Sequence, residues 1–327
     1  MDQATLKTVL AGSSGHSVGV LGDFCVDVYW ELNPELGERS IETGIVTTPV
    51  GAARYSPGGA GNIVANLRGL EARRLACFGA LGIDPFGAWL RHALLHGDKA
   101  GDSLLRIDRN EYHTPVYCKP MLNGSEQSRF DLGNVPICDA EAKRLLRSLK
   151  EALATLDVLI INQQLHHGIH TEFFRREFAA LLKRAPRLPR IVFDGREHLD
   201  AYPEAILKIN ASAASRLAFG HPGVAPEESG TTIMNRTGNV LVVTDGENGS
   251  YVFEKEKTTF IPAIRYDGPV DTVGAGDSFT AGFALGLAGG FPLTTAAELG
   301  NACSAVTIRK IAQTGVPSPE ELAALFE

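Results

Sequence analysis

Features that would place this chain in several specialised classes of protein are missing from its sequence. The five cysteines are odd in number and widely spaced, and no C-x-x-C pair occurs, which argues against a disulfide framework or a zinc site. No basic region followed by an apolar run opens the chain, so no signal peptide is predicted. The most apolar stretch, residues 279–291, is too short and too rich in glycine to span a bilayer. We therefore expect a cytoplasmic protein without a membrane partner.

A surplus of basic residues is also missing. The 31 Lys and Arg residues are outnumbered by 38 Asp and Glu residues, and the net charge of −7 argues against a nucleic-acid partner. The sequence has no low-complexity tract, long charge run or internal repeat. A chain of 327 residues with this ordinary composition can bury a large core. We expect a single domain over residues 1–327.

Short apolar segments alternate with amphipathic ones along much of the chain. Residues 17–22 are typical of the first strand of a parallel sheet. Strands alternating with helices predict βαβ units, and hence an α/β fold with a doubly wound, mostly parallel sheet flanked by helices. Further strands are expected at 157–161, 190–194 and 240–244, and helices at 140–156, 171–183, 277–287, 295–311 and 319–326.

A second, smaller sheet is predicted from two insertions, at about 31–56 and 112–132. Residues 43–50 are β-branched and partly alternating, and Asn123-Gly124 between two short β-type segments is a strong hairpin signal. Arg129 on this hairpin could contact an anionic group of a substrate, although a solvated strand residue is the commoner interpretation. The exposed strand edges of such a sheet are often paired with another subunit, which predicts a homodimer.

The most informative segment is DTVGAGDSFTAGF, residues 271–283. Its second half has Phe279, Phe283 and Leu287 at the spacing of one helix face. A glycine-rich turn that opens into a helix presents backbone N–H groups at the positive end of the helix dipole, where phosphate binds well. Asp277 adds a carboxylate that could take a proton from an attacking hydroxyl. Ordinary turn and cap chemistry is the alternative.

Two further segments are candidates for the other substrate. Asp23 and Asp27 follow the first predicted strand, and ligands of open α/β sheets bind at strand ends. Each carboxylate oxygen can accept a proton from a hydroxyl. Residues 57–70, PGGAGNIVANLRGL, combine a glycine pair that lets the backbone approach a ligand with a predicted helix. Loop, cap and turn roles are the alternatives for both segments.

These motifs resemble the two signatures of the ribokinase-like (PfkB) carbohydrate kinase family. The C-terminal signature of that family is close to D-T-x-G-A-G-D-x-F, and its N-terminal signature is G-G-x-x-N followed by a helix. The resemblance extends from Gly22 to PSPEEL at residues 317–322, nearly the whole chain. Within the family, GDFCVDVYW, PGGAGN and VPSPEEL are most similar to the heptose 7-phosphate kinases. The resemblance implies a ribokinase-like sheet with a small β-sheet lid over the sugar.

The resemblance also implies roles for individual residues. Asp277 would be the catalytic base, beside an anion hole for the transferred phosphate formed by Gly274, Ala275 and Gly276. Asp271 would lie near a monovalent-cation site, such as one for potassium. The sugar would contact Asp23, Asp27, Gly58, Gly59 and Asn62, with Arg129 as a further candidate. The nucleotide would lie near Asn210, Thr244, Gly246, Gly249 and Asn301. The implied cofactors are ATP and Mg²⁺.

The chain departs from the family pattern at two places. The family usually has N-x-x-E where this chain has Asn210 followed by Ala213, and NQQLHHG at residues 162–168 replaces the acidic-aromatic-x-Lys-Gly string of the heptose kinases. The favoured hypothesis is an ATP-dependent sugar kinase. The departures motivate a second one, a catalytically weak or silent relative that binds a sugar or a nucleotide.

Two other activities are alternatives to these hypotheses. A kinase of a nucleoside or another non-sugar alcohol would use the same scaffold, but the paired Asp23 and Asp27 favour a ligand with many hydroxyls. A nicotinamide-dependent dehydrogenase is disfavoured, because no G-x-G-x-x-G follows the first predicted strand.

Overall fold

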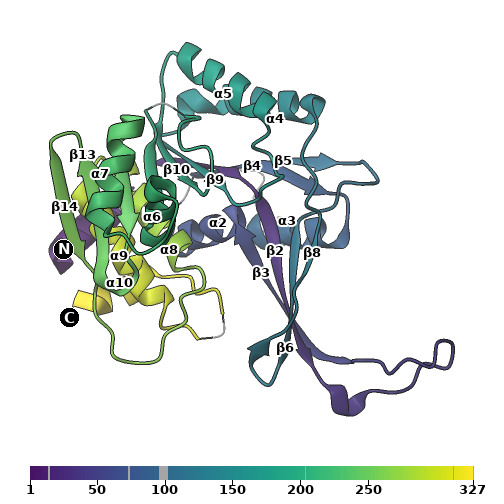
Figure 1. Cartoon of the computed structure of the whole chain (residues 1–327). Coiled ribbons are helices and arrows are strands. Elements are labelled where there is room, and N and C mark those ends of the chain that lie inside the picture. The colour runs from purple at the N-terminus through teal and green to yellow at the C-terminus, as the bar shows by residue number, and fades with distance from the viewer. Residues whose placement is uncertain (14, 73, 96–101, 203, 312, 327) are drawn as a thin grey trace.

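The chain forms two β-sheets, the larger of which is flanked by helices (Figure 1). The structure, a computed structural model, describes all residues except 14, 73, 96–101, 203, 312 and 327. The strands are β1 (Ser17–Gly22), β2 (Phe24–Leu32), β3 (Val50–Gly59), β4 (Arg74–Gly82), β5 (Asp102–Ile107), β6 (Val116–Leu122), β7 (Ser125–Glu126), β8 (Phe130–Leu132), β9 (Val158–Gln163), β10 (Arg190–Gly195), β11 (Ile206–Asn210), β12 (Leu241–Thr244), β13 (Gly249–Glu254) and β14 (Lys257–Pro262). The helices are α1 (Gln3–Ser13), α2 (Ala60–Gly69), α3 (Pro85–Leu95), α4 (Asp139–Ala152), α5 (Glu172–Arg184), α6 (Ala211–Phe219), α7 (Pro226–Thr237), α8 (Ala275–Ala288), α9 (Leu293–Thr307) and α10 (Pro319–Ala323).

The larger sheet has nine strands in the order β14-β13-β12-β11-β10-β9-β1-β4-β5. Adjacent strands from β12 to β5 run parallel, whereas β13 and β14 pair antiparallel at one edge. Antiparallel strands at one edge are common on otherwise parallel sheets. The predicted α/β class with a mostly parallel sheet is confirmed.

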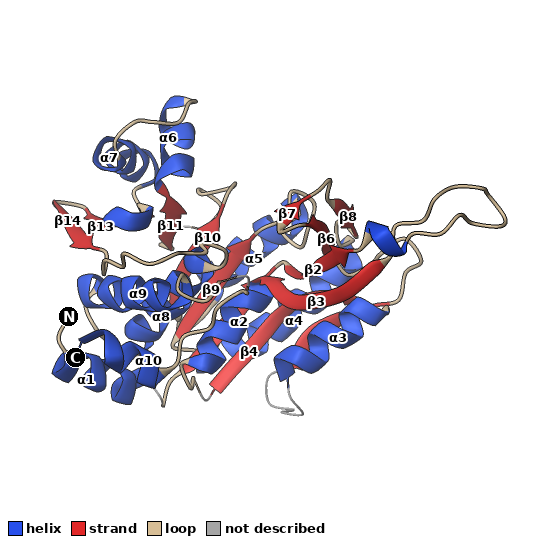
Figure 2. Ribbon diagram, turned by 90° about the horizontal axis from the view of Figure 1, so that it is seen from below, coloured by secondary structure: helices blue, strands red, loops and turns tan. Residues whose placement is uncertain are grey.

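Helices cover both faces of this sheet because the side chains of its strands alternate in direction. Along β9, Val158 and Ile160 belong to one hydrophobic cluster, whereas Leu159 and Ile161 belong to the other. The first cluster includes residues of α1, α2, α3, α8 and α9, and the second includes residues of α4, α5, α6 and α7 (Figures 1 and 2). Among the described residues, no helix is both long enough and apolar enough to cross a membrane.

The smaller sheet, which we call the lid, consists of β3-β2-β6-β7, with β8 paired to β6. A single residue, Asp23, separates the end of β1 from the start of β2, so the chain passes directly from an interior strand of the larger sheet into the lid. The predicted hairpin is present. Asn123 and Gly124 have φ angles of 51° and 78°, and two positive φ values are what a type I′ turn requires.

Boundaries in the lid differ from the sequence prediction. Residues 43–50 were expected to form a strand, but the described backbone there has only an isolated bridge between Arg39 and Val46. The strand starts at Val50 and continues through the glycine pair at its end, for which a turn was one of the alternatives. Most residues of 43–50 and of the first half of β3 are exposed. Strand prediction depends on the alternation of apolar and polar residues that a buried face imposes, and this segment has no such face.

Candidate active site

Polar side chains meet at the carboxyl ends of the central strands. In the register of the sheet, Gly22 is beside Asn162, Asn162 is beside Asp194, and Asp194 is beside Lys208. Parallel strands end at the same edge, where α/β proteins bind ligands. A cavity of about 430 Å³ opens there. Of the predicted site residues, its lining includes Asp27, Gly58, Gly59, Asn62, Arg129, Asn210, Gly274, Gly276 and Asp277.

The start of α8 lines this cavity with Gly274, Gly276 and Asp277. Gly274 precedes the helix with a φ of 81°, and its carbonyl accepts a hydrogen bond from the N–H of Ser278 at 2.9 Å. The N–H of Ala275 donates to the Thr272 carbonyl at 3.2 Å. The N–H groups in the first turn of a helix have no carbonyl partner within the helix. An anion would therefore meet the amides of Gly276 and Asp277 rather than that of Ala275.

Asp277 lies in the first turn of α8 and faces the cavity. Its side-chain oxygen Oδ2 accepts a hydrogen bond from Asn62 Nδ2 at 2.6 Å. Burial, followed by the negative charge of Asp194, raises the pKa of the Asp277 carboxyl from 3.8 to about 6, against the opposing effects of Asn62 and Lys208. A carboxylate with a pKa near neutrality suits a general base.

Lys208, on β11, is a site residue that sequence reasoning missed. Its buried ammonium contacts both carboxylate oxygens of Asp194, at 3.3 and 3.2 Å, and donates to the Gly276 carbonyl at 3.1 Å. Thr280 also donates to Asp194, at 2.6 Å. This network fixes a cation beside the start of α8. The sequence signal was a lysine within an apolar strand, two residues before Asn210, the N-cap of α6.

Asp27 and Lys119 form the opposite, lid-side wall of the cavity. Lys119 Nζ lies 2.8 Å from Asp27 Oδ1, and both side chains are largely buried. A Cβ added at Gly58 would lie 2.9 Å from Asp27 Oδ2, so a side chain there would press on this carboxylate. Sequence reasoning found Asp27 and Gly58 but missed Lys119, because β6 brings it to β2 only through strand pairing in the lid.

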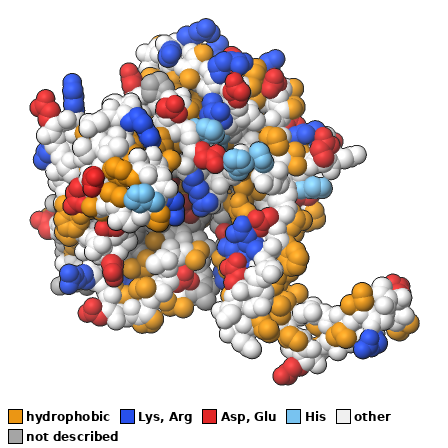
Figure 3. All heavy atoms as spheres, in the orientation of Figure 1, with side chains coloured by type: hydrophobic (Ala, Val, Ile, Leu, Met, Phe, Trp, Pro, Cys, Tyr) orange, Lys and Arg blue, Asp and Glu red, His pale blue; other side chains and the backbone are white. Residues whose placement is uncertain are grey.

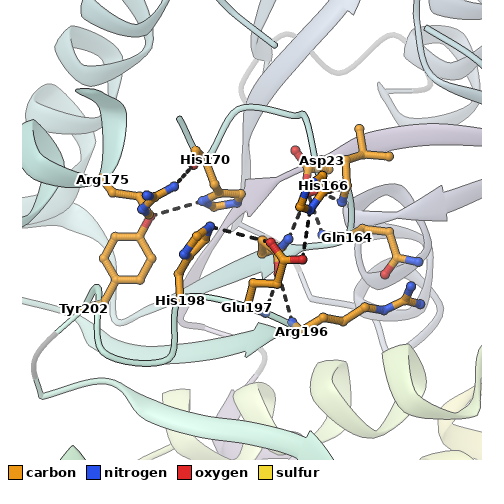
Figure 4. Close-up of polar contacts among 11 residues, drawn as sticks. Asp23, Gln164, His166, His170, Arg175, Arg196, Glu197, His198 and Tyr202 are labelled. Atoms are coloured by element: carbon orange, nitrogen blue, oxygen red, sulfur yellow. Dashed lines mark hydrogen bonds and ion pairs between the residues drawn. The ribbon is translucent and has the colours of Figure 1, made fainter. Parts of the chain in front are cut away.

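Asp23 has a structural role in the free protein, and its predicted contact with the substrate stays a prediction. Its side chain is 2% exposed and lies outside the described lining of the cavity. Its two carboxylate oxygens accept hydrogen bonds from the backbone N–H groups of Gln164, Leu165 and Ile169 at 2.9, 2.9 and 3.0 Å (Figure 4). Asp23 therefore holds the loop after β9 against the end of β1.

The predicted nucleotide-binding residues are spread over a wider area than the cavity. Asn210 lines it, and its side chain caps α6 by accepting from the N–H of Ala213 at 2.8 Å. Thr244, Gly246 and Gly249 surround the turn between β12 and β13, outside the described lining. Asn301 is buried and uses its Nδ2 to donate to the carbonyls of Ile261 and Pro262, at 3.1 and 3.3 Å. Its amide nitrogen therefore has a structural task, and its nucleotide role stays a prediction.

The described residues provide no ready-made metal centre. They contain no group of three or more His, Cys, Asp or Glu side chains arranged to hold a metal ion. Asp271 accepts the N–H of Val273 at 3.0 Å, and its own N–H donates to the Ile308 carbonyl at 2.8 Å. Its predicted role near a monovalent cation remains a prediction. Mg²⁺ usually keeps several waters and binds one or two carboxylates together with substrate phosphates, which fits Asp194 or Asp277 at this cavity.

The fold is that of the ribokinase-like phosphotransferases. A ribokinase from Arabidopsis thaliana, solved with ribose and ATP, superposes with a TM-score of 0.71 at 20% identity, covering 95% of this chain and 99% of that chain. Phosphofructokinase-2 from Escherichia coli, solved with potassium, gives a TM-score of 0.72 at 16% identity, covering 95% of this chain and 98% of that chain. At these identities the likeness establishes the fold.

The chain belongs to the pfkB family of carbohydrate kinases, whose model matches residues 137–320. The bifunctional protein HldE of Azorhizobium caulinodans is 27% identical over 325 residues, which cover 98% of this chain and 66% of that protein. The bifunctional protein HldE of Hydrogenovibrio crunogenus is 24% identical over 304 residues, which cover 92% of this chain and 61% of that protein. The chain thus spans less than two thirds of the length of these relatives.

Proposed function

We propose that the protein transfers the γ-phosphate of ATP to a hydroxyl of a sugar or a sugar phosphate. The observation that carries this proposal is Asp277, a carboxylate of raised pKa at the start of α8, hydrogen-bonded to Asn62 and facing the cavity. Asp277 takes the proton of the attacking hydroxyl as the oxygen bonds to the γ-phosphorus. The bond to the β-phosphate oxygen breaks, and ADP leaves.

Hydrogen-bond donors around the start of α8 stabilise the negative charge of the transferred phosphoryl group. The amides of Gly276 and Asp277 and the ammonium of Lys208 lie on this side of the cavity. Preorganised donors of this kind lower the barrier without any reorganisation during the reaction. Asn210 and the turn at Gly246 and Gly249 remain the proposed contacts of the nucleotide. Mg²⁺, when bound with the nucleotide, neutralises phosphate charge beside Asp194 or Asp277.

The acceptor is held from the lid side, by Asp27, Gly58, Gly59 and Asn62. A second cavity of about 240 Å³ adjoins the first, and Arg129 and Arg196 line both. Arg129 is paired with Asp131 at 2.6 Å, while the Arg196 side chain extends past Gln164 in Figure 4. Guanidinium groups bind phosphate well. This supports a sugar phosphate over a free sugar as the acceptor, with its phosphate in the second cavity.

Replacing Asp277 by Asn tests the proposed base. The Asn side chain keeps an oxygen for the Asn62 hydrogen bond, so the fold should persist while kcat falls by about 10²–10⁴. ADP release is measured over a panel of sugars and their phosphates, for example fructose and fructose 6-phosphate, with and without potassium. Near-normal turnover by the Asp277→Asn protein would remove the proposed role of this residue.

A silent sugar-binding relative is the second candidate, because Ala213 stands where the family usually has a glutamate. Calorimetry separates the two functions. Heat of sugar or nucleotide binding without ADP release, across the whole panel and several divalent ions, would favour the silent relative.

We also propose that the protein is a homodimer that pairs through the lid. An arm between β2 and β3 projects from the lid, and hydrophobic side chains lie along it (Figures 2 and 3). An exposed apolar surface of this kind is typical of an interaction site. The exposed apolar residues are Leu36, Ile41, Ile45, Val46 and Val50.

A further inference from the structure

Asn162, at the carboxyl end of β9, has a feature that the proposed reaction does not use. Its side chain is 2% exposed and lines the cavity. Among the described residues, none forms a hydrogen bond with its side-chain oxygen Oδ1, which is buried. A buried carbonyl oxygen without a partner lowers the stability of the folded protein. A polar side chain at this position therefore needs an explanation other than the stability of the free protein.

The backbone of Asn162, in contrast, is held firmly. Its carbonyl oxygen accepts from the N–H of Asp23 at 3.3 Å and contacts His170 Nε2 at 3.0 Å. His170 Nδ1 lies 3.1 Å from the Tyr202 hydroxyl (Figure 4). Burial lowers the pKa of His170, so its imidazole is neutral at pH 7. The neutral ring donates from Nε2 to Asn162 and accepts the Tyr202 hydroxyl proton at Nδ1. The end of β9 is thus fixed while the Asn162 amide oxygen stays unpaired.

The position of this amide connects it with the acceptor. An added Cβ at Gly59 would lie 3.5 Å from Asn162 Oδ1, so the oxygen adjoins the glycine pair predicted to touch the sugar. Gly58, Gly59 and Asp27 line the same cavity. Asp27 is occupied by Lys119 at 2.8 Å, and Asp277 is occupied by Asn62 at 2.6 Å. The amide of Asn162 differs from these charged acceptors in having a neutral oxygen without a partner.

We propose that Asn162 is a specificity-determining residue whose amide binds a hydroxyl of the acceptor, with Oδ1 accepting the hydroxyl proton. The inference rests on the proposed function, because it assumes a polyhydroxyl ligand in this cavity. A site built to bind a hydroxyl rejects an analogue that lacks it, because the buried polar group would then stay unpaired. Asn162 therefore discriminates between sugars that differ in a hydroxyl near Gly59.

The test compares Asn162→Leu and Asn162→Ala with Thr259→Val. Thr259 Oγ1 on β14 is also a buried oxygen without a partner among the described residues, but it lies outside the cavity lining, which makes it a matched control. The acceptor is whichever of D-fructose, D-mannose, D-ribose and fructose 6-phosphate gives the highest kcat/KM with the wild-type protein. We expect kcat/KM for this acceptor to fall about 10- to 100-fold in both Asn162 variants. The KM for ATP should stay unchanged.

Stability separates this role from a structural one. Asn162→Leu removes an unpaired buried oxygen, so its unfolding temperature should equal or exceed that of the wild-type protein. Thr259→Val should also keep its stability, but with wild-type kinetics. An unchanged acceptor kcat/KM in both Asn162 variants would overturn the inference and leave the proposed function intact. A lowered unfolding temperature with equal losses for acceptor and ATP would also overturn it.

A wild-type protein that releases no ADP with the whole panel would count against the proposed function instead. Calorimetric titration with the same four sugars then decides the role of Asn162. Weaker binding to Asn162→Leu than to wild type supports the inference. Equal binding, or no binding of any of these sugars to the wild-type protein, overturns it.

Discussion

The proposed role of Asp277 as a base requires an ionised carboxylate. Since its pKa is raised to about 6, we predict that kcat/KM falls below pH 6 and reaches a plateau above pH 7. A pH–rate profile of the wild-type protein, with ATP held constant and saturating, measures this acidic limb. Undiminished activity at pH 5 would contradict the assignment, because most Asp277 side chains would then be protonated.

The same raised pKa has a consequence for stability. The ionised form of Asp277 is disfavoured in the folded protein, so it lowers the free energy of unfolding. This loss of stability is complete above pH 6 and disappears as the pH falls toward 4. We predict that Asp277→Asn raises the free energy of unfolding at pH 7.5 by about 1–3 kcal/mol, and that this gain vanishes near pH 4. Urea unfolding of both proteins at the two pH values measures it. A destabilised variant at pH 7.5 would contradict the expectation.

Lys208 offers a second prediction for a single residue. Its positive charge lowers the pKa of Asp277 and lies beside the start of α8. Lys208→Met should reduce kcat by about 10²-fold or more, as removal of one stabilising group does elsewhere, and should move the acidic limb to higher pH. Lys119→Met is the control, because it removes a cation from the lid-side wall of the cavity. It should raise the KM for the acceptor without shifting the acidic part of the pH–rate profile. Similar pH profiles for the two variants would contradict the role of Lys208.

These residues also show the limits of the sequence. Asp277, Asp27 and Asn62 stand in motifs with distinctive spacing, and all three line the cavity. Lys208 and Lys119 have no motif, since each reaches the site through pairing with a strand distant in sequence. The hydrogen bonds of Asp23 to the loop after β9 could not be predicted, because a strand-end carboxylate that binds a ligand and one that binds a loop have the same sequence signature.

The turn that leads into α8 leaves little room for a side chain at Gly274. Gly274 has a φ of 81°, and an added Cβ would lie 2.8 Å from Thr314 Cγ2 and 2.9 Å from Asn62 Nδ2. We predict that Gly274→Ala costs about 1–2 kcal/mol through its backbone conformation and also lowers kcat, because the methyl group displaces Asn62 from Asp277. Gly290 is a matched control, since it has a φ of 77° with nothing within 4 Å of its added Cβ.

Gly290→Ala should therefore lose a similar stability and keep its kcat. Thermal unfolding and ADP release, measured on both variants, make the comparison. Equal kcat values for the two glycine variants would contradict the proposed coupling between the α8 entry and Asn62.

Elements were predictable where their periodicity was unambiguous. The helix after DTVGAGDSF was expected at 277–287 and forms α8, and the strand expected at 17–22 is β1. The helices α6 and α7 were not predicted, since both are short and have few buried residues. Strand β2 was not predicted either, because its GDFCVDVYW motif was interpreted as the loop of a site.

At the scale of the whole molecule, the fold gives a prediction about assembly. If the apolar arm of the lid pairs with a second copy, light scattering at working concentration should give the mass of a dimer. Replacing Ile41 and Ile45 together by Asp should convert it to a monomer, because charged side chains would be buried in the interface. Leu188 is an exposed apolar residue outside the lid, and its replacement by Asp should leave the mass unchanged. A monomeric wild-type protein would contradict the proposed assembly.

Only one residue separates β1 from β2, so the lid is anchored directly in an interior strand of the larger sheet. Asp27 and Lys119 belong to the lid, whereas Asp277 and Lys208 belong to the larger sheet and its helices. The lid-side acceptor contacts and the proposed transfer residues therefore stand on different parts of the fold. The reaction that we propose depends on how the lid is positioned relative to the larger sheet, and a substitution at this junction would act on both sets of residues at once.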